Sequence, residues 1–276
     1  MMKSIKILVA THLNYPIPQS NILLPVHVGS VNSELKIDIQ RDDEGENISS
    51  KNNQYCELTA IYWAWKNLKE LDYIGLAHYR RYPTFEKESI RDIFINKFKY
   101  IFYRYFYNSI EPGSNFTKWH SLDNKLNYNF IKDVETSLRY YKDSYDIYVP
   151  NPIKYSNYNV RSCFNVIIPS YIIEIISKTI HKFYPEFSNE FTKLLNGNRI
   201  FPCNMFVFNS VIFSEYSKFM FTILFETEEI LKLSNIKPIP RTFGYIGELL
   251  TSCFIEYKIS NGSKTMFFNI LNIKNI

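Results

Sequence analysis

An apolar run that ends in a cluster of charged and aromatic side chains constrains the fold more than any other feature of this sequence. Residues 72–77 have the pattern of a short buried strand, and His78, Tyr79, Arg80 and Arg81 follow it without a break. Ligands of α/β proteins gather outside the carboxyl ends of such strands. Adjacent arginines are costly to bury unless an anion meets them, and a phosphorylated ligand is the simplest partner. The run therefore predicts an α/β fold with an anion site at this strand end.

The same four residues allow two interpretations. If the strand continued through them, alternation would send His78 and Arg80 to one face and Tyr79 and Arg81 to the other. One pair would then face the ligand while the scaffold holds the other pair. The alternative is a surface strand end whose arginines are solvated, and the sequence leaves it open.

The segments around this strand favour a parallel sheet. Residues 5–10 are an apolar run typical of a buried first strand, and Thr11 and His12 follow it. Residues 55–68 place apolar side chains at helical spacing. The order strand, loop, helix, strand is what a parallel sheet requires. Further strands are predicted at 145–150, 202–208 and 265–268, and further helices at 171–183, 185–195, 212–231 and 241–255.

The chain of 276 residues has no repeat and no linker, so we expect a single domain over residues 1–276. Residues 86–142 differ from the rest because aromatic and basic side chains interleave in their central part, at 93–107. We interpret them as an insertion that packs over the site. A segment that lies at a membrane interface is the alternative.

The composition narrows the class of partner. A net charge of +5 fits an anionic ligand or a loose attraction to an anionic membrane surface, and it is too small and scattered to indicate nucleic acid. The 22 tyrosines and 22 phenylalanines suit a wide cleft for sugar-like ligands, although a low-GC genome explains the same counts. No apolar run is long enough to span a bilayer, and none resembles a signal peptide. The expected location is the cytoplasm, with contact at the inner face of the cytoplasmic membrane left open.

Several common catalytic patterns are missing from the sequence. It has no glycine-rich phosphate loop, no paired Cys/His metal spacing and no G-x-S-x-G motif. These gaps argue against ordinary dehydrogenases, P-loop kinases, zinc hydrolases and α/β-hydrolases. The acidic stretch at 42–47 lacks the residue order of a calcium loop, and we interpret it as a loop that leads to the first helix. Asn47 and Asn52 can instead donate to ligand hydroxyls or phosphate.

Three polar residues further along the chain are candidates for a site. Asn204 begins an apolar strand, where it must find a buried partner or a ligand. Arg241 and Glu248 are seven positions apart, on roughly the same face of a helix that covers both. A carboxylate near a helix N-terminus in a cleft is a candidate general base, and a structural Arg–Glu pair is the alternative.

Four blocks of the sequence together resemble a known family. The segments 47–67, 75–82 (GLAHYRRY), 204–207 (NMFV) and 241–250 (RTFGYIGELL) resemble, in the same order, a bacterial family of capsular and exopolysaccharide-biosynthesis glycosyltransferases known as domain of unknown function 4422. The resemblance covers nearly the whole chain. It implies a GT-A-like glycosyltransferase fold, with a mostly parallel central sheet flanked by helices. It also implies a nucleotide-sugar donor, with a UDP-sugar favoured, and a polysaccharide or lipid-linked oligosaccharide acceptor.

The resemblance also suggests roles for the candidate residues. Glu248 would take the proton from the acceptor hydroxyl, and a positioned base of this kind favours an inverting displacement. GT-A enzymes usually carry an Asp-x-Asp metal motif, which this chain lacks, so cationic side chains would stabilise the leaving diphosphate. Mn²⁺ or Mg²⁺ nevertheless stays open as a cofactor. The expected donor-binding residues are Thr11, His12, Asn47, Asn52, His78, Tyr79, Arg80, Arg81, Asn204 and Arg241.

Two other functions stay open at this point. A non-catalytic protein that binds a sugar nucleotide or a glycan would keep the arginines and tolerate the loss of Glu248. A polysaccharide phosphotransferase would also use paired arginines, but it should need a divalent ion and an acidic ligand pair.

Overall fold

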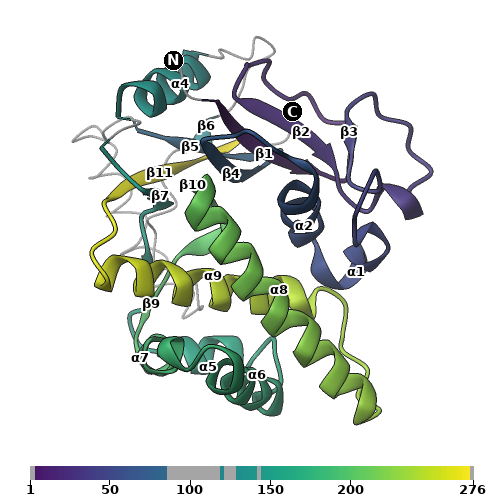
Figure 1. Cartoon of the computed structure of the whole chain (residues 1–276), viewed down its shortest axis with the longest axis vertical. Coiled ribbons are helices and arrows are strands. Elements are labelled where there is room, and N and C mark those ends of the chain that lie inside the picture. Colours follow the sequence, from purple (N-terminus) through teal and green to yellow (C-terminus); the bar gives the residue numbers. More distant parts are fainter. Residues whose placement is uncertain (1–3, 86–118, 121–128, 142–143, 274–276) are drawn as a thin grey trace, which may run out of the picture.

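The computed structural model describes residues 4–85, 119–120, 129–141 and 144–273. A nine-stranded mixed sheet lies at its centre, with helices on both faces (Figure 1). Most of the predicted insertion at 86–142 lies outside the described residues, which include from it only β6 (Trp119–His120) and α4 (Asn129–Tyr141). The single domain over residues 1–276 stays a prediction.

The N-terminal half of the sheet is parallel, as predicted. It contains β1 (Ile5–Thr11), β2 (Leu23–His27), β3 (Gln40–Arg41) and β4 (Tyr73–His78), in the order β3-β2-β1-β4. Ala10 pairs with His78 and Thr11 with His27, so three strands end at the same edge of the sheet. Most positions of β1 and β4 are buried and apolar, which explains the apolar runs in the sequence.

The other half of the sheet is mixed, so a mostly parallel sheet is not confirmed for the whole fold. β10 (Phe206–Asn209) is antiparallel to β4 and to β7 (Ile147–Pro150). β11 (Thr265–Ile273) is parallel to β6 and β7 and antiparallel to β5 (Arg81–Thr84). Strand pairings therefore run in a closed circuit through β4, β10, β7, β11 and β5.

The expectation that one strand continues through the arginines is wrong. β4 ends at His78, the chain turns at Tyr79 and Arg80, and His78 pairs with Arg81 at the start of β5. Residues directly opposite each other in an antiparallel pair lie on the same face. His78 and Arg81 are therefore neighbours, and the alternation inferred from the sequence does not hold.

Helices cover the two faces of the sheet unequally. α1 (Asn52–Tyr55), α2 (Leu58–Asn67), α8 (Ser210–Leu233) and α9 (Thr242–Ser260) share one core cluster, and α4 contributes to a second cluster on the opposite face (Figure 1). α5 (Val160–Phe164), α6 (Ser170–Phe183) and α7 (Ser188–Asn196) pack below α8 and α9. The short strands β8 (Ile153–Lys154) and β9 (Arg199–Ile200) form an antiparallel pair, in which β8 precedes α5 and β9 follows α7 in the chain. Single 3-10 turns are η1 (Ser30–Asn32), η2 (Ser49–Lys51), η3 (Pro185–Phe187) and η4 (Pro202–Asn204).

Within the described part of the chain, no helix combines the length and apolarity needed to cross a membrane.

The helix predicted at 55–68 is broken near its start. Cys56 has a φ of 51°, outside the helical region, and it separates α1 from α2. The Asn52 amide stabilises the break by donating to the Cys56 carbonyl at 2.8 Å. Glu57 consequently lies immediately before α2, next to the sheet edge described below.

Two glycines allow the close approaches that this arrangement needs. A Cβ on Gly75 would lie 2.6 Å from the Phe206 carbonyl oxygen, so only glycine lets β10 pair with β4 at this position. A Cβ on Gly247 would lie 2.8 Å from Cδ1 of Leu58, where α9 packs near the start of α2. These contacts bring α9 and the segment before β10 to the strand ends.

Candidate functional site

The candidate site lies where several elements end at one edge of the sheet. β1, β2 and β4 bring their carboxyl ends there. β10 is antiparallel to β4, with Phe206 opposite Leu76, so η4 at its start reaches the same edge. The starts of α2 and α9 complete the site. This edge is where α/β proteins generally bind ligands.

Arg80 is held at the turn between β4 and β5 by an aromatic neighbour. Its guanidinium donates to the Tyr79 hydroxyl at 2.7 Å and stacks 4.8 Å from the ring centroid. The His12 ring meets the same tyrosine edge-on at 5.6 Å. Burial, followed by the charges of Arg80 and Arg241, lowers the pKa of His12. Tyr79 thus lies between the guanidinium of Arg80 and the imidazole of His12, and Arg241 is close enough to act on the same imidazole.

The end of β2 adds a residue that the sequence argument missed. His27 is only 1% exposed, and neither ring nitrogen has a hydrogen-bond partner among the described residues. Burial lowers the pKa of His27 and keeps its ring neutral. Beside it, the Thr11 hydroxyl donates to the Leu13 carbonyl at 2.7 Å and thereby fixes the chain as it leaves β1. The sequence signal for His27 is a lone imidazole between Val26 and Val28.

Glu248 is the carboxylate whose protonation the site perturbs most. Burial raises its pKa to about 7, and the neighbouring Glu57 carboxylate adds to the shift. Arg81, Arg241 and a hydrogen bond from the Cys203 backbone act in the opposite direction. The expectation that one helix covers both Arg241 and Glu248 is wrong, because α9 begins at Thr242 and Arg241 precedes it with a φ of 67°. A carboxylate that titrates near neutral pH is suited to take a proton from a hydroxyl.

Glu57 is held in place by a chain of buried hydrogen bonds. The Asn204 amide donates to Glu57 at 2.8 Å and to the Gly244 carbonyl at 3.3 Å. The Thr251 hydroxyl donates to the Asn204 oxygen at 2.9 Å, and Tyr216 bonds to Thr251 at 2.9 Å. The expectation that Asn204 must find a buried partner or a ligand is therefore met inside the protein. No local pattern in the sequence indicates this pairing, because Glu57 and Asn204 are far apart in the chain.

An unusual backbone turn connects His78 to Glu248. Cys203 and Asn204 have φ values of 68° and 53°, which are uncommon for residues other than glycine. The Cys203 carbonyl oxygen in this turn lies 2.7 Å from Nε2 of His78. The Cys203 backbone also forms a hydrogen bond with Glu248. Burial lowers the pKa of His78, and Arg81 and Arg241 lower it further against an opposing effect of Glu57. Strained turns of this kind are found at functional sites.

The two asparagines of the acidic loop region bond within the local structure. The Asn47 amide donates to two carbonyls of its own loop, at 3.0 and 2.8 Å. The Asn52 amide donates to the Cys56 carbonyl and to Thr59. Asp42 is fully buried and accepts hydrogen bonds from Gly29, Ser30 and Ser49, so the loop is built around a carboxylate. A role for Asn47 and Asn52 in donor binding stays a prediction.

Metal sites in proteins are usually built from clusters of His, Cys, Asp and Glu side chains. In the ranges that the structure describes, no group of three or more His, Cys, Asp and Glu side chains could hold a metal ion. The two carboxylates of the site, Glu57 and Glu248, act on each other electrostatically. Mn²⁺ or Mg²⁺ as a cofactor stays a prediction.

Comparisons with known proteins support this description of the fold. Residues 6–259 match the model of a family described as "Domain of unknown function (DUF4422)". No curated protein matches the chain. The fold is similar to that of the apo structure of WbbM, described as a bifunctional glycosyltransferase, with a TM-score of 0.79 and 24% identity. The match covers 99% of this chain and 46% of WbbM, so the chain spans less than half the length of that protein.

Proposed function

The chain belongs to the DUF4422 family, and we propose that it is a glycosyltransferase that moves a sugar from a nucleotide-sugar donor to a glycan hydroxyl. The observation that carries the proposal is the gathering of cations and a base at the edge where the strands end: Arg80 and Arg241 act on His12, and Arg81 and Arg241 act on Glu248, whose pKa burial raises to about 7. The likeness of the fold to WbbM is consistent with it.

The donor would lie across the ends of β1, β2 and β4. Thr11, His12 and His27 would contact the nucleotide, since His27 offers a buried donor and acceptor with no protein partner in the described chain. Arg80 and Arg81 would bind the diphosphate, because guanidinium groups recognise phosphate oxygens with paired hydrogen bonds. His78 and Tyr79 would shape the space for the sugar. A UDP-sugar is the favoured donor.

The chemical step would be a single displacement at the anomeric carbon. The acceptor hydroxyl attacks that carbon as Glu248 removes its proton, and the bond from the carbon to the diphosphate oxygen breaks. The diphosphate leaves with the bonding electrons, and the arginines stabilise its charge. Such a displacement inverts the anomeric centre. Arg241 would orient Glu248, and Glu57, fixed by Asn204, helps to keep the pKa of Glu248 high enough for a base.

The proposal extends to the setting of the reaction. The acceptor is a polysaccharide or lipid-linked oligosaccharide precursor of a capsule, exopolysaccharide or lipopolysaccharide. The enzyme acts in the cytoplasm, where contact with the inner face of the cytoplasmic membrane would bring it to lipid-linked acceptors. These assignments rest on the family resemblance of the sequence.

A transfer assay with product identification tests the proposal. The purified chain is incubated with a panel of UDP-, GDP- and dTDP-sugars and lipid-linked glycan extracts, and the masses of the products are measured by mass spectrometry. We expect a glycan that gains one sugar residue, with release of the nucleoside diphosphate. A gain of a sugar phosphate that requires Mg²⁺ would instead identify a polysaccharide phosphotransferase. Nucleotide or glycan binding without turnover would identify a binding protein.

A further inference from the structure

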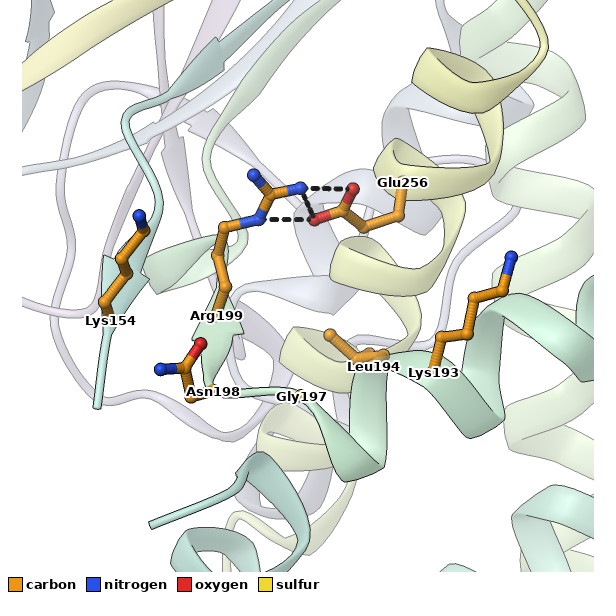
Figure 2. Close-up of a pocket in the computed structure, with 7 residues that line it drawn as sticks. All are labelled: Lys154, Lys193, Leu194, Gly197, Asn198, Arg199 and Glu256. Carbon is orange, nitrogen blue, oxygen red and sulfur yellow. Dashed lines mark hydrogen bonds and ion pairs between the residues drawn. The ribbon is translucent and has the colours of Figure 1, made fainter. Parts of the chain in front are cut away.

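A pocket of about 330 Å³ lies apart from the strand-end site, between β8, β9, α7 and α9 (Figure 2). Its wall combines apolar surface, including Leu194, with polar side chains: Lys154 on β8, Asn198 and Arg199 at β9, Lys193 near the end of α7, and Glu256 on α9. Lys154 and Arg199 extend from neighbouring strands, and Glu256 meets the guanidinium from the α9 side (Figure 2). None of these residues has a role in the reaction proposed above.

The charges around this pocket do not balance. Arg199 is matched by Glu256, to which its guanidinium donates at 2.6, 2.7 and 2.9 Å, and Lys193 is matched by Glu190 at 2.7 Å. Lys154 has no ion-pair partner among the described residues, and it lies directly opposite Arg199 in the β8–β9 pair. Because Glu256 already neutralises Arg199, the excess positive charge at the pocket is that of Lys154. An anion bound between Lys154 and Arg199 would balance it.

Arg199 keeps hydrogen-bonding capacity for such an anion. Its bonds to Glu256 use Nε and one terminal nitrogen, so the second terminal nitrogen lies outside the ion pair. Together with the ammonium group of Lys154, it provides donors of the kind that bind carboxylate and phosphate. The fixed ion pair also means that Arg199 is already ordered before a ligand arrives, which lowers the entropic cost of binding.

The pocket is connected to the strand-end site by three short segments. Glu256 and Glu248 are eight residues apart on α9, which is about 12 Å along a helix axis. Tyr155 follows Lys154, and burial, with contributions from Cys163 and Glu248, raises its pKa to about 12. β9 leads through Phe201 to Cys203, whose backbone bonds to Glu248. Because about 12 Å is longer than one sugar, a ligand that contacts both places must be a glycan of several sugars.

We propose that this pocket is an acceptor subsite, in which Lys154 and Arg199 bind an anionic group of the acceptor glycan several sugars away from the hydroxyl that is glycosylated. The anionic group is a carboxylate, as in a uronic acid, or a phosphate. This inference rests on the proposed function, because it takes the glycan at Glu248 to be the acceptor. Its consequence is a preference for acidic glycans over neutral ones of the same length.

Direct binding to the full chain tests the pocket without any turnover. Trigalacturonate, inorganic phosphate and the neutral trisaccharide maltotriose are titrated by calorimetry into the wild type and Lys154→Gln. We expect one of the two anions to bind, with an affinity about tenfold lower in Lys154→Gln, a loss of about 1.4 kcal/mol. Lys218→Gln, an exposed lysine on α8, is the matched control and should bind like the wild type. Binding of trigalacturonate alone indicates a uronate, and binding of phosphate indicates a phosphorylated glycan.

Three results would overturn the proposal: binding of neither anion, equal affinity for maltotriose and trigalacturonate, or equal affinity in wild type and Lys154→Gln. Titration of UDP into the same proteins separates this proposal from the proposed function. UDP binding without anion binding would rule out the acceptor subsite and leave the proposed transferase function in place. Anion binding at Lys154 without binding of any nucleotide would leave a glycan-binding protein.

Discussion

At the scale of single residues, the proposed sugar transfer depends on the protonation of Glu248. Its pKa of about 7 lies above that of an ordinary glutamate, so the basic form accumulates only as the pH rises through neutrality. We therefore expect kcat/KM to increase from pH 6 to pH 8 and then to level off. Glu248→Gln should lower kcat by about 10²–10⁴ with little change in donor affinity. Full activity of Glu248→Gln, or a rate independent of pH over this range, would remove Glu248 from the role of base.

The same shift predicts how stability depends on pH. The folded state holds the Glu248 proton more tightly than the unfolded state, so this group's contribution to stability is full below about pH 4.5 and is lost as the pH rises through about 7. Glu248→Gln removes the effect. The free energy of unfolding of Glu248→Gln minus that of the wild type should therefore be larger at pH 8 than at pH 5, as measured by urea unfolding. Glu229→Gln, at an exposed position on α8, is the control and should show no such trend; a parallel trend there would contradict the assignment.

Asn204 carries a second prediction at this scale, because it is the buried link between Glu57 and Thr251. Asn204→Ala removes one hydrogen bond from each partner, and we expect the free energy of unfolding to fall by about 1–3 kcal/mol. Thr251→Val removes the bonds of Thr251 to Asn204 and Tyr216. It keeps the bond from Asn204 to the Glu57 carboxylate, so it should cost less. Equilibrium unfolding of both variants measures the difference. If Thr251→Val proved the more damaging, the chain of bonds would not depend on Asn204.

At the scale of secondary structure elements, the sequence predicts the apolar strands and long helices well. The buried strands at β1 and β4 and the helices α6, α8 and α9 lie close to their predicted ranges, because each buries a continuous apolar face. It does not predict two breaks in the chain. The turn at Tyr79–Arg80 has no glycine, asparagine or proline to mark it, and Cys56 interrupts a helical pattern that is otherwise regular. The turn is followed by the pairing of β5 with the distant strand β11, and the break at Cys56 is stabilised by the Asn52 amide.

Gly75 makes the pairing of β4 with β10 testable. A methyl group at this position would collide with the Phe206 carbonyl oxygen at 2.6 Å and with Cγ2 of Val207 at 2.7 Å. Gly75→Ala should therefore lower the free energy of unfolding by about 1–3 kcal/mol, as overpacked cores do. Adding Val207→Ala relieves only the side-chain contact, so it should not restore the stability of the wild type. A Gly75→Ala variant as stable as the wild type would contradict the close strand approach.

At the scale of the whole molecule, the candidate site is assembled from segments far apart in the chain. Motifs 75–82 and 241–250 identified most of its charged residues, because arginines and carboxylates are conspicuous next to apolar runs. The sequence could not show that Asn204 holds Glu57, or that Glu57 and Arg81 act in opposite directions on Glu248. It could not show the antiparallel half of the sheet either, because pairing between distant strands leaves no local pattern. Those features depend on tertiary contacts.

The measurement that tests the central claim most directly is a thermal-shift titration of the full chain with nucleoside diphosphates, in EDTA and in Mn²⁺. A ligand at about 100 times its Kd stabilises the folded state by about 2.7 kcal/mol. We predict that one nucleoside diphosphate, UDP in the first place, stabilises the wild type in EDTA and that Arg80→Ala abolishes the shift while Lys218→Gln retains it. If no nucleoside diphosphate stabilised the protein under either condition, the donor site at the strand ends would be wrong.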